Sequence, residues 1–227
     1  MVETHRKTLS ALELFDSATV QNALIILQGY VEANLDYTDP SIHRMIDSKP
    51  CVVGIAVTSS WTPISIPKVQ ITNKNELYEN IKSFNLPVIS VLKDVDNESH
   101  RGAIIGDGMA YIMKAMGAVA AVVDGNARDV PGIKKAGLDL WATGRVPGHG
   151  PFNMIEQGQD LMVNGLLIRT GDILVCDGDG ITRIEPRLLN EIFRACQEVR
   201  KKEAKLHKYF SSPDFDSNAW ELWKETN

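Results

Sequence analysis

Apolar residues in the first hundred positions follow helical spacing in some segments and strand spacing in others. Between Leu12 and Tyr30 they recur so that they share one helical face, with Ser17 or Thr19 as a cap. Two short runs rich in β-branched residues predict buried strands, and a polar segment between them has helical spacing. The predicted elements are a helix over 12–30, a strand over 51–59, a helix over 74–83 and a strand over 87–92.

The clearest alternation lies in the middle of the chain. Met109, Met113 and Met116 recur at helical spacing together with Ile112, and we interpret this stripe as core packing. Strand–helix–strand–helix–strand alternation is typical of an α/β unit with parallel strands. The predicted elements are a strand over 102–105, a helix over 109–116, a strand over 119–123, a polar loop over 124–129, a helix over 130–136 and a strand over 138–142.

The pattern changes after Pro147. Residues 161–186 predict short antiparallel strands joined by Gly and Asp turns, and residues 187–210 predict a long amphipathic helix. Its apolar stripe contains Leu188, Ile192, Ala195, Cys196 and Val199. We expect one domain over 1–227, with an N-terminal helical segment over 7–30 and a C-terminal helix plus tail over 187–227. The tail carries Phe215, Trp220, Leu222 and Trp223, which predict docking either over a site or at a subunit interface.

Composition narrows the class of partner. The net charge of −5, from 24 basic and 29 acidic residues, argues against a nucleic-acid partner, because binding to phosphates requires clustered Lys and Arg. The three cysteines are widely spaced and form no C-x-x-C motif, which argues against a disulfide framework or a zinc site. The start of the chain lacks the apolar core of a signal peptide, and no apolar run has membrane-spanning length. We therefore expect a cytoplasmic protein with no nucleic-acid and no membrane partner.

Several familiar motifs are incomplete. The sequence from Gly106 to Gly108 begins like a dinucleotide-binding loop, but Tyr111 stands at the third glycine position. The stretch 177–180 resembles the start of a calcium loop, but it lacks the spaced Glu and is typical of a tight turn. His149 lies in a glycine-rich loop, where it is either an exposed loop residue or a neighbour of a site.

A more specific constellation consists of Asp107, Arg128 and Asp129. The acid and the Arg-Asp pair each follow a predicted strand, and ligands of parallel sheets bind beyond the carboxyl ends of the strands. Carboxylates with few imidazoles suit a hard cation such as Mg²⁺ or Mn²⁺. Arginine is a permanent forked donor for a substrate carboxylate or an enolate. The backbone N–H groups of Gly108 and Met109 open a helix and predict an anion site.

This segment resembles the family that contains class II pyruvate aldolases of the 4-hydroxy-4-methyl-2-oxoglutarate type and the regulator of ribonuclease E activity A. The aldolase branch carries an acid, twenty intervening residues and Arg-Asp, which correspond here to Asp107, Arg128 and Asp129. The stretch GDILVCDGDGITRIEP is similar to a later family segment. FDSATVQNAL is similar to the N-terminal helix of the family, with Asn22 in place of the usual Asp. The resemblance covers roughly residues 12–205.

The resemblance implies an RraA-like α/β fold, a β/β/α swivelling-domain sandwich, assembled as a homotrimer or homohexamer. It implies that Asp129 binds a divalent cation directly and that Asp107 and Glu203 act through water, Glu203 from a neighbouring subunit. Glu203 is otherwise an exposed helix residue. The implied catalytic residues are Asp107 and Arg128, and the implied substrate-binding residues are Gly106, Gly108, Met109 and Arg128.

The implied activity is that of a divalent-metal-dependent lyase acting on a small 2-oxo acid. It would cleave 4-hydroxy-2-oxo acids to pyruvate, decarboxylate oxaloacetate, or do both through a pyruvate enolate. The alternatives are a non-catalytic regulator of ribonuclease activity and a related lyase for another sugar acid. Asp107 and Asp129 favour a lyase over the regulator, whose branch lacks the acidic residues. Gly132 stands where the aldolases carry Glu or Asp, so the sequence leaves the physiological substrate open, as it does the preferred metal and the choice between trimer and hexamer.

Overall fold

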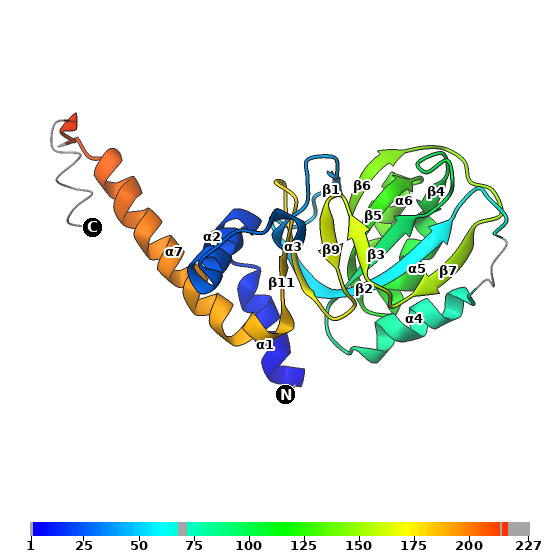
Figure 1. Ribbon diagram of the computed structural model, residues 1–227, viewed down its shortest axis with the longest axis horizontal. Helices are drawn as coiled ribbons and strands as arrows, with labels where there is room; N and C mark the ends of the chain where they lie inside the picture. The colour runs from blue at the N-terminus through cyan, green and yellow to red at the C-terminus, as the bar shows by residue number, and fades with distance from the viewer. Residues whose placement is uncertain (1, 68–71, 214, 218–227) are drawn as a thin grey trace.

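The computed structural model describes residues 2–67, 72–213 and 215–217. Figure 1 shows a body of strands flanked by short helices, with an arm formed by the helices near the two chain ends. The helices of the described residues are α1 (Val2–Leu12), α2 (Ser17–Gln28), α3 (Ala33–Asp36), α4 (Lys74–Ser83), α5 (Asp107–Ala115), α6 (Val130–Ala136) and α7 (Leu189–Phe210), with a 3₁₀ turn at Pro186–Leu188. None of these helices is long and apolar enough to cross a membrane.

The main sheet is mixed. Its strand order is β1-β6-β5-β3-β2-β10-β11, with β4 added beside β5 and β7 added beside β2. The central strands β2, β3, β5 and β6 are parallel, and β1, β7 and β10 pair antiparallel. The parallel pairing of β4, β5 and β6 confirms the alternation predicted for residues 102–142. The strands are β1 (His43–Ile46), β2 (Val52–Thr62), β3 (Val88–Asp94), β4 (Ala103–Ile105), β5 (Ala118–Ala127), β6 (Asp139–Arg145), β7 (Asn153–Gln157), β8 (Leu161–Val163), β9 (Leu166–Ile168), β10 (Ile173–Cys176) and β11 (Ile181–Ile184).

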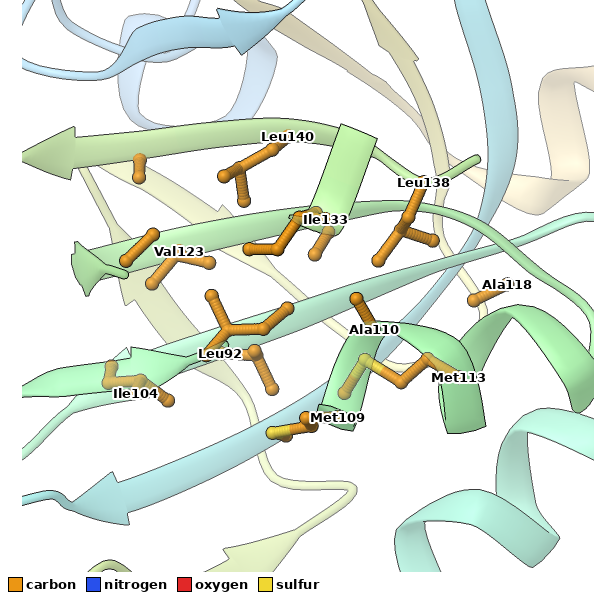
Figure 2. Packing of buried hydrophobic residues seen from close by; sticks show 14 of the residues in the cluster. Leu92, Ile104, Met109, Ala110, Met113, Ala118, Val123, Ile133, Leu138 and Leu140 are labelled. Atoms are coloured by element: carbon orange, nitrogen blue, oxygen red, sulfur yellow. The ribbon is translucent and has the colours of Figure 1, made fainter. Parts of the chain in front are cut away.

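Hydrophobic clusters cover both faces of this sheet. Figure 2 shows one of them, in which Leu92 and Val123 of the sheet pack against Met113 of α5 and Ile133 of α6. The opposite face packs against the separate β8–β9 hairpin. The order hairpin, sheet, helices gives the three layers of the predicted β/β/α sandwich. The methionine stripe is core as predicted at Met109 and Met113, whereas Ile112 is exposed and lies on the other side of α5.

A third cluster holds the helical arm against the edge of the sheet. Here α1, α2 and α7 pack on β2 and β10, and the predicted stripe of α7 is buried. Cys51, Cys176 and Cys196 are buried free thiols, which agrees with the absence of a predicted disulfide framework. Burial raises the pKa of both Cys51 and Cys196 to about 12, so both stay protonated. The predicted docking of Trp220 and Trp223 falls outside the described residues.

Some predicted boundaries were wrong. The helix predicted over 12–30 spans only Ser17–Gln28, because α1 ends at Leu12 and Asp16, rather than Ser17 or Thr19, caps α2: its carboxylate accepts the N–H of Thr19 at 2.7 Å. Ser17 instead donates its N–H and its hydroxyl to Asp177, at 2.6 and 2.8 Å. The predicted loop over 124–129 is largely strand, since β5 continues to residue 127. Strands β1 and β7 were not predicted, because they contain polar residues at several positions.

Replacement of Asp16 tests the link between α2 and the arm. The carboxylate caps α2 and also pairs with Arg200 of α7 at 2.6 Å. We expect Asp16→Ala to lower the free energy of unfolding by about 1 kcal/mol in urea titrations at pH 7. Asp16→Asn should lower the free energy of unfolding by a smaller amount, because Asn is also a good N-cap residue.

The same pair of variants has a predicted pH dependence. Partial burial raises the pKa of Asp16, but the hydrogen bonds from Thr19 and the charge of Arg200 outweigh it and hold the pKa below its usual value. The charge-specific stabilisation is therefore present above about pH 4 and is lost as the pH falls through the folded-state pKa. The difference in the free energy of unfolding between wild type and Asp16→Asn should be smaller at pH 3 than at pH 7. A difference that grows on acidification would contradict this link.

Candidate functional site

The predicted site residues follow two strands that lie side by side. One edge of β5 pairs with two strands in turn. It pairs with β3 up to Asp124 and then with β4 at Asn126 and Ala127. The N–H of Arg128 then donates to the carbonyl of Ile105 at 3.0 Å. Helix α5 starts directly after β4, and α6 starts directly after the Arg-Asp pair. The pairing of β4 with β5 therefore brings both predicted chain segments to one sheet edge.

Two glycines form the contacts between these segments. A Cβ atom added at Gly106 would lie 3.2 Å from Oδ2 of Asp129 and 3.3 Å from Nε of Arg128. A Cβ atom at Gly132 of α6 would lie 2.7 Å from Cβ of Asp107 and 2.9 Å from its Oδ2. The first segment thus touches the Arg-Asp pair, and the third residue of α6 touches Asp107. The structure brings Asp107, Arg128 and Asp129 together as the sequence predicts.

The backbone of Asp129 is unusual. Its φ of 54° and ψ of 34° place a non-glycine residue in the left-handed region. Such a conformation costs about 1–3 kcal/mol and is concentrated at functional sites. Its carbonyl accepts the N–H groups of Gly132 and Ile133, at 2.8 and 3.0 Å, so the backbone starts α6 while the carboxylate makes no capping bond. The carboxylate is about half exposed and lies 3.3 Å from Nε of Arg128.

The carboxylate of Asp107 occupies part of the predicted anion site. Its Oδ1 accepts the N–H of Gly108 at 2.7 Å. In this structure the N–H of Gly108 is therefore already bonded to a neighbouring carboxylate, and the role of Gly108 and Met109 in binding a substrate stays a prediction. Asp107 as a whole remains an exposed residue, and its Oδ2 faces Gly132.

A small cavity opens beside these residues. Its volume is about 200 Å³, a size that suits a small organic acid rather than a nucleotide. Its wall includes Asp107, Arg128 and His149, so His149 is an exposed loop residue that also lies beside the candidate site. The remaining lining residues are Ala103, Ile104, Ile105, Gly106, Gly108, Met109 and Phe152. Phe152 was missed, because its position after a polar loop gave no signal of a site.

The oxygen ligands at this edge fit a hydrated hard cation. No group of three or more His, Cys, Asp or Glu side chains within the described part of the chain could hold a metal ion. Mg²⁺, however, is usually bound through only one or two carboxylates and keeps several waters. Asp107 and Asp129 supply such a pair. Glu203 is not brought to them within one chain: it belongs to α7, which lies in the arm (Figure 1), and its carboxylate is 3.8 Å from Nη1 of Arg200.

Comparison with known proteins identifies the family. A family model described as RraA-like, Aldolase/RraA, matches residues 17–183. The chain belongs to the RraA-like family. This match includes the whole Asp107 to Asp129 region and both hairpins that follow it, and it confirms the predicted resemblance. The family includes lyases and non-catalytic members.

Individual relatives are distant. An uncharacterized protein of Methanocaldococcus jannaschii is 26% identical over 166 residues, which cover 73% of this chain and 76% of that protein. A Halalkalibacterium halodurans protein, named provisionally as a 4-hydroxy-4-methyl-2-oxoglutarate aldolase, is 32% identical over 108 residues. That second match covers 45% of this chain and 48% of the relative.

Solved structures confirm the predicted RraA-like fold. An uncharacterized Pseudomonas syringae protein has a TM-score of 0.71 and 24% identity, and the match covers 92% of this chain and 90% of that one. A Streptomyces coelicolor protein, described as an unusual member of the RNase ES inhibitor RraA family, has a TM-score of 0.68 and 21% identity. That match covers 88% of this chain and 96% of the other. At these identities the likeness establishes the fold.

Two alanine substitutions test the contact between Gly132 and Asp107. Both Gly108 and Gly132 lie in the first turn of a helix, but a Cβ atom at Gly108 meets no atom within 4 Å. We expect Gly108→Ala to raise the free energy of unfolding by up to about 1 kcal/mol, as alanine does in a helix. Gly132→Ala should give no such gain, because its methyl group displaces Asp107.

Urea titrations of both variants and a crystal structure of Gly132→Ala provide the measurements. The structure should show Asp107 and the start of α6 moved apart, because a change of rotamer would leave Cβ of Asp107 in place. Equal stabilisation by the two substitutions, with Asp107 unmoved, would contradict the contact.

Proposed function

We propose that this protein is a divalent-metal-dependent carbon–carbon lyase. It would cleave 4-hydroxy-2-oxo acids of the 4-hydroxy-4-methyl-2-oxoglutarate type to pyruvate, decarboxylate oxaloacetate, or catalyse both reactions. The observation that carries the proposal is the meeting of Asp107 with Arg128 and Asp129 at the edge of a small cavity. Membership of a family that includes lyases, and the name of one distant relative, support it.

Two carboxylates are assigned to the cation. Asp129 would bind Mg²⁺ or Mn²⁺ directly, and Asp107 would act through a water molecule. When bound, a divalent cation supplies Lewis-acid polarisation of the 2-oxo group. The left-handed backbone of Asp129 supports this role, because it directs the carboxylate away from the capping position at the start of α6.

Arg128 is assigned to the substrate. Arg128 is a residue of the cavity wall, and its Nε lies 3.3 Å from Oδ2 of Asp129. A fixed guanidinium binds a carboxylate through parallel hydrogen bonds and stabilises negative charge on an adjacent oxygen. Cleavage of the C3–C4 bond, in either reaction, leaves its electron pair on pyruvate enolate. One positioned cationic group can therefore serve both reactions, because both form the same anion.

The assembly is part of the proposal. We assign the whole chain, 1–227, to one RraA-like domain that assembles as a homotrimer or homohexamer. Glu203 of a neighbouring copy would then approach the cation through water, since within one chain α7 points away from β4 (Figure 1). Similar structures named for ribonuclease inhibition are at most 21% identical, so they support a shared fold and carry no argument for that activity.

Pyruvate release from oxaloacetate tests the proposed activity. We expect wild type to produce pyruvate with Mg²⁺ and to lose this activity in EDTA. Asp129→Ala should lower kcat/KM at least about 100-fold, the typical effect of removing a group that stabilises the transition state. A coupled assay with lactate dehydrogenase measures pyruvate directly.

Asp179→Ala is the matched control. It removes an exposed aspartate in the turn between β10 and β11, outside the cavity, and should leave kcat/KM within about twofold of wild type. Wild type without metal-dependent turnover of oxaloacetate or of 4-hydroxy-4-methyl-2-oxoglutarate would overturn the proposed function. Full activity of Asp129→Ala would overturn the assignment of the site.

A further inference from the structure

The loop between β6 and β7 is fixed beside the site by long-range backbone contacts. The carbonyl of Gly148 accepts the N–H of Ala103, the first residue of β4, at 2.9 Å. The N–H of Gly150 donates to the carbonyl of Pro63 at 2.7 Å. A Cβ atom at Gly150 would lie 2.7 Å from the carbonyl oxygen of Ile64, so only glycine fits this approach. His149, between the two glycines, is therefore held at a defined place in the cavity wall.

Hydrogen bonding sets the orientation of the His149 ring. Its Nδ1 lies 2.7 Å from the carbonyl oxygen of Gly150. A carbonyl oxygen only accepts, so Nδ1 carries the hydrogen in the neutral ring and Nε2 keeps its lone pair. A neutral imidazole held in this tautomer can remove a proton through Nε2.

Two aromatic rings support the imidazole from the core. The ring centroids of His149 and Phe152 are 5.5 Å apart, and those of Phe152 and Trp61 are 4.9 Å apart. Trp61 is fully buried in the core and donates its indole N–H to the hydroxyl of Ser59 at 2.8 Å. The exposed ring of His149 thus packs on side chains that are anchored in the core, and this packing holds the ring in place.

We propose that His149 is a further catalytic residue of this site, which accepts the proton of the 4-hydroxyl group of a 4-hydroxy-2-oxo acid. The inference rests on the proposed function and deepens it. Removal of the hydroxyl proton lets the O–H electron pair form the C4 carbonyl group. The C3–C4 bond breaks, and its electrons form the pyruvate enolate. The imidazolium then returns the proton to C3, so that pyruvate and the second carbonyl compound leave with all atoms balanced.

His149 suits this step better than Asp107 does. One oxygen of Asp107 already accepts the N–H of Gly108, and its side chain packs against Gly132. The same carboxylate is assigned to the cation. His149 lines the same cavity, and its ring makes its hydrogen bond through Nδ1. We therefore assign charge stabilisation to Asp107 and proton transfer to Nε2 of His149.

Decarboxylation of oxaloacetate distinguishes the proposed role of His149 from the roles of the cation and of Arg128. This reaction breaks the bond to a carboxylate, so there is no hydroxyl proton to remove. The enolate it leaves is protonated by water after release. Loss of the imidazole should therefore damage aldol cleavage far more than decarboxylation, whereas damage to the cation or to Arg128 should affect both reactions.

The test compares both reactions in wild type, His149→Gln and His149→Ala, with thermal melts to confirm folding. We expect His149→Gln to lower kcat for cleavage of 4-hydroxy-4-methyl-2-oxoglutarate by about 100-fold or more, with KM within about threefold. Its oxaloacetate decarboxylation should fall by less than about tenfold. Added imidazole should raise the cleavage rate of His149→Ala, because it replaces the missing base. His43→Gln, which changes an exposed histidine outside the cavity, should behave as wild type.

The outcomes separate the two proposals. If wild type cleaves the substrate and His149→Gln cleaves it equally fast, the role of His149 is overturned while the proposed function stands. Equal loss of both reactions in His149→Gln, without rescue of His149→Ala by imidazole, also overturns that role, because it indicates structural damage. Wild type that turns over neither substrate overturns both proposals.

Discussion

The site depends on the parallel pairing of the three-residue strand β4 with the end of β5. Strand β5 extends beyond its pairing with β3. Strand β4 then pairs with the same edge of β5, at Asn126 and Ala127. The bond from Arg128 N–H to the Ile105 carbonyl completes the pairing. Every later feature follows from it, because α5 and α6 must then start side by side. Without this pairing, Asp107 and Asp129 would belong to unrelated turns.

Close packing around the two helix starts makes the arrangement rigid. Gly106 and Gly132 allow the backbone of one segment to touch side chains of the other, at distances that a Cβ atom would not permit without displacing them. The left-handed backbone of Asp129 is a local cost of about 1–3 kcal/mol. The core beneath it offsets this cost, since Ile104, Ile133 and Val123 pack in one buried cluster (Figure 2). A stable core thus holds exposed charges in a strained arrangement.

The sequence pattern predicted the parallel strands and the central constellation, because buried parallel strands are short apolar runs and ligands gather at their carboxyl ends. The β/β/α layers were implied by the family resemblance. The pattern missed the extension of β5, because Asp124 and Asn126 look like loop residues until their partners are known: Asp124 pairs with Lys93 at 2.9 Å, and Asn126 donates to the carbonyl of His100. The place of His149 could not be predicted either. Its loop is fixed by contacts with residues 63 and 103, which no local pattern encodes.

The central claim is that one edge of the sheet binds a hard cation and a 2-oxo acid together. Diffraction from crystals soaked with Mn²⁺ and oxalate, an analogue of pyruvate enolate, tests it most directly. We expect an anomalous peak at the carboxylate of Asp129, with Asp107 close to the water shell of the metal and oxalate in contact with Arg128. Full manganese occupancy at another place, with Asp107 and Asp129 unliganded, would contradict it.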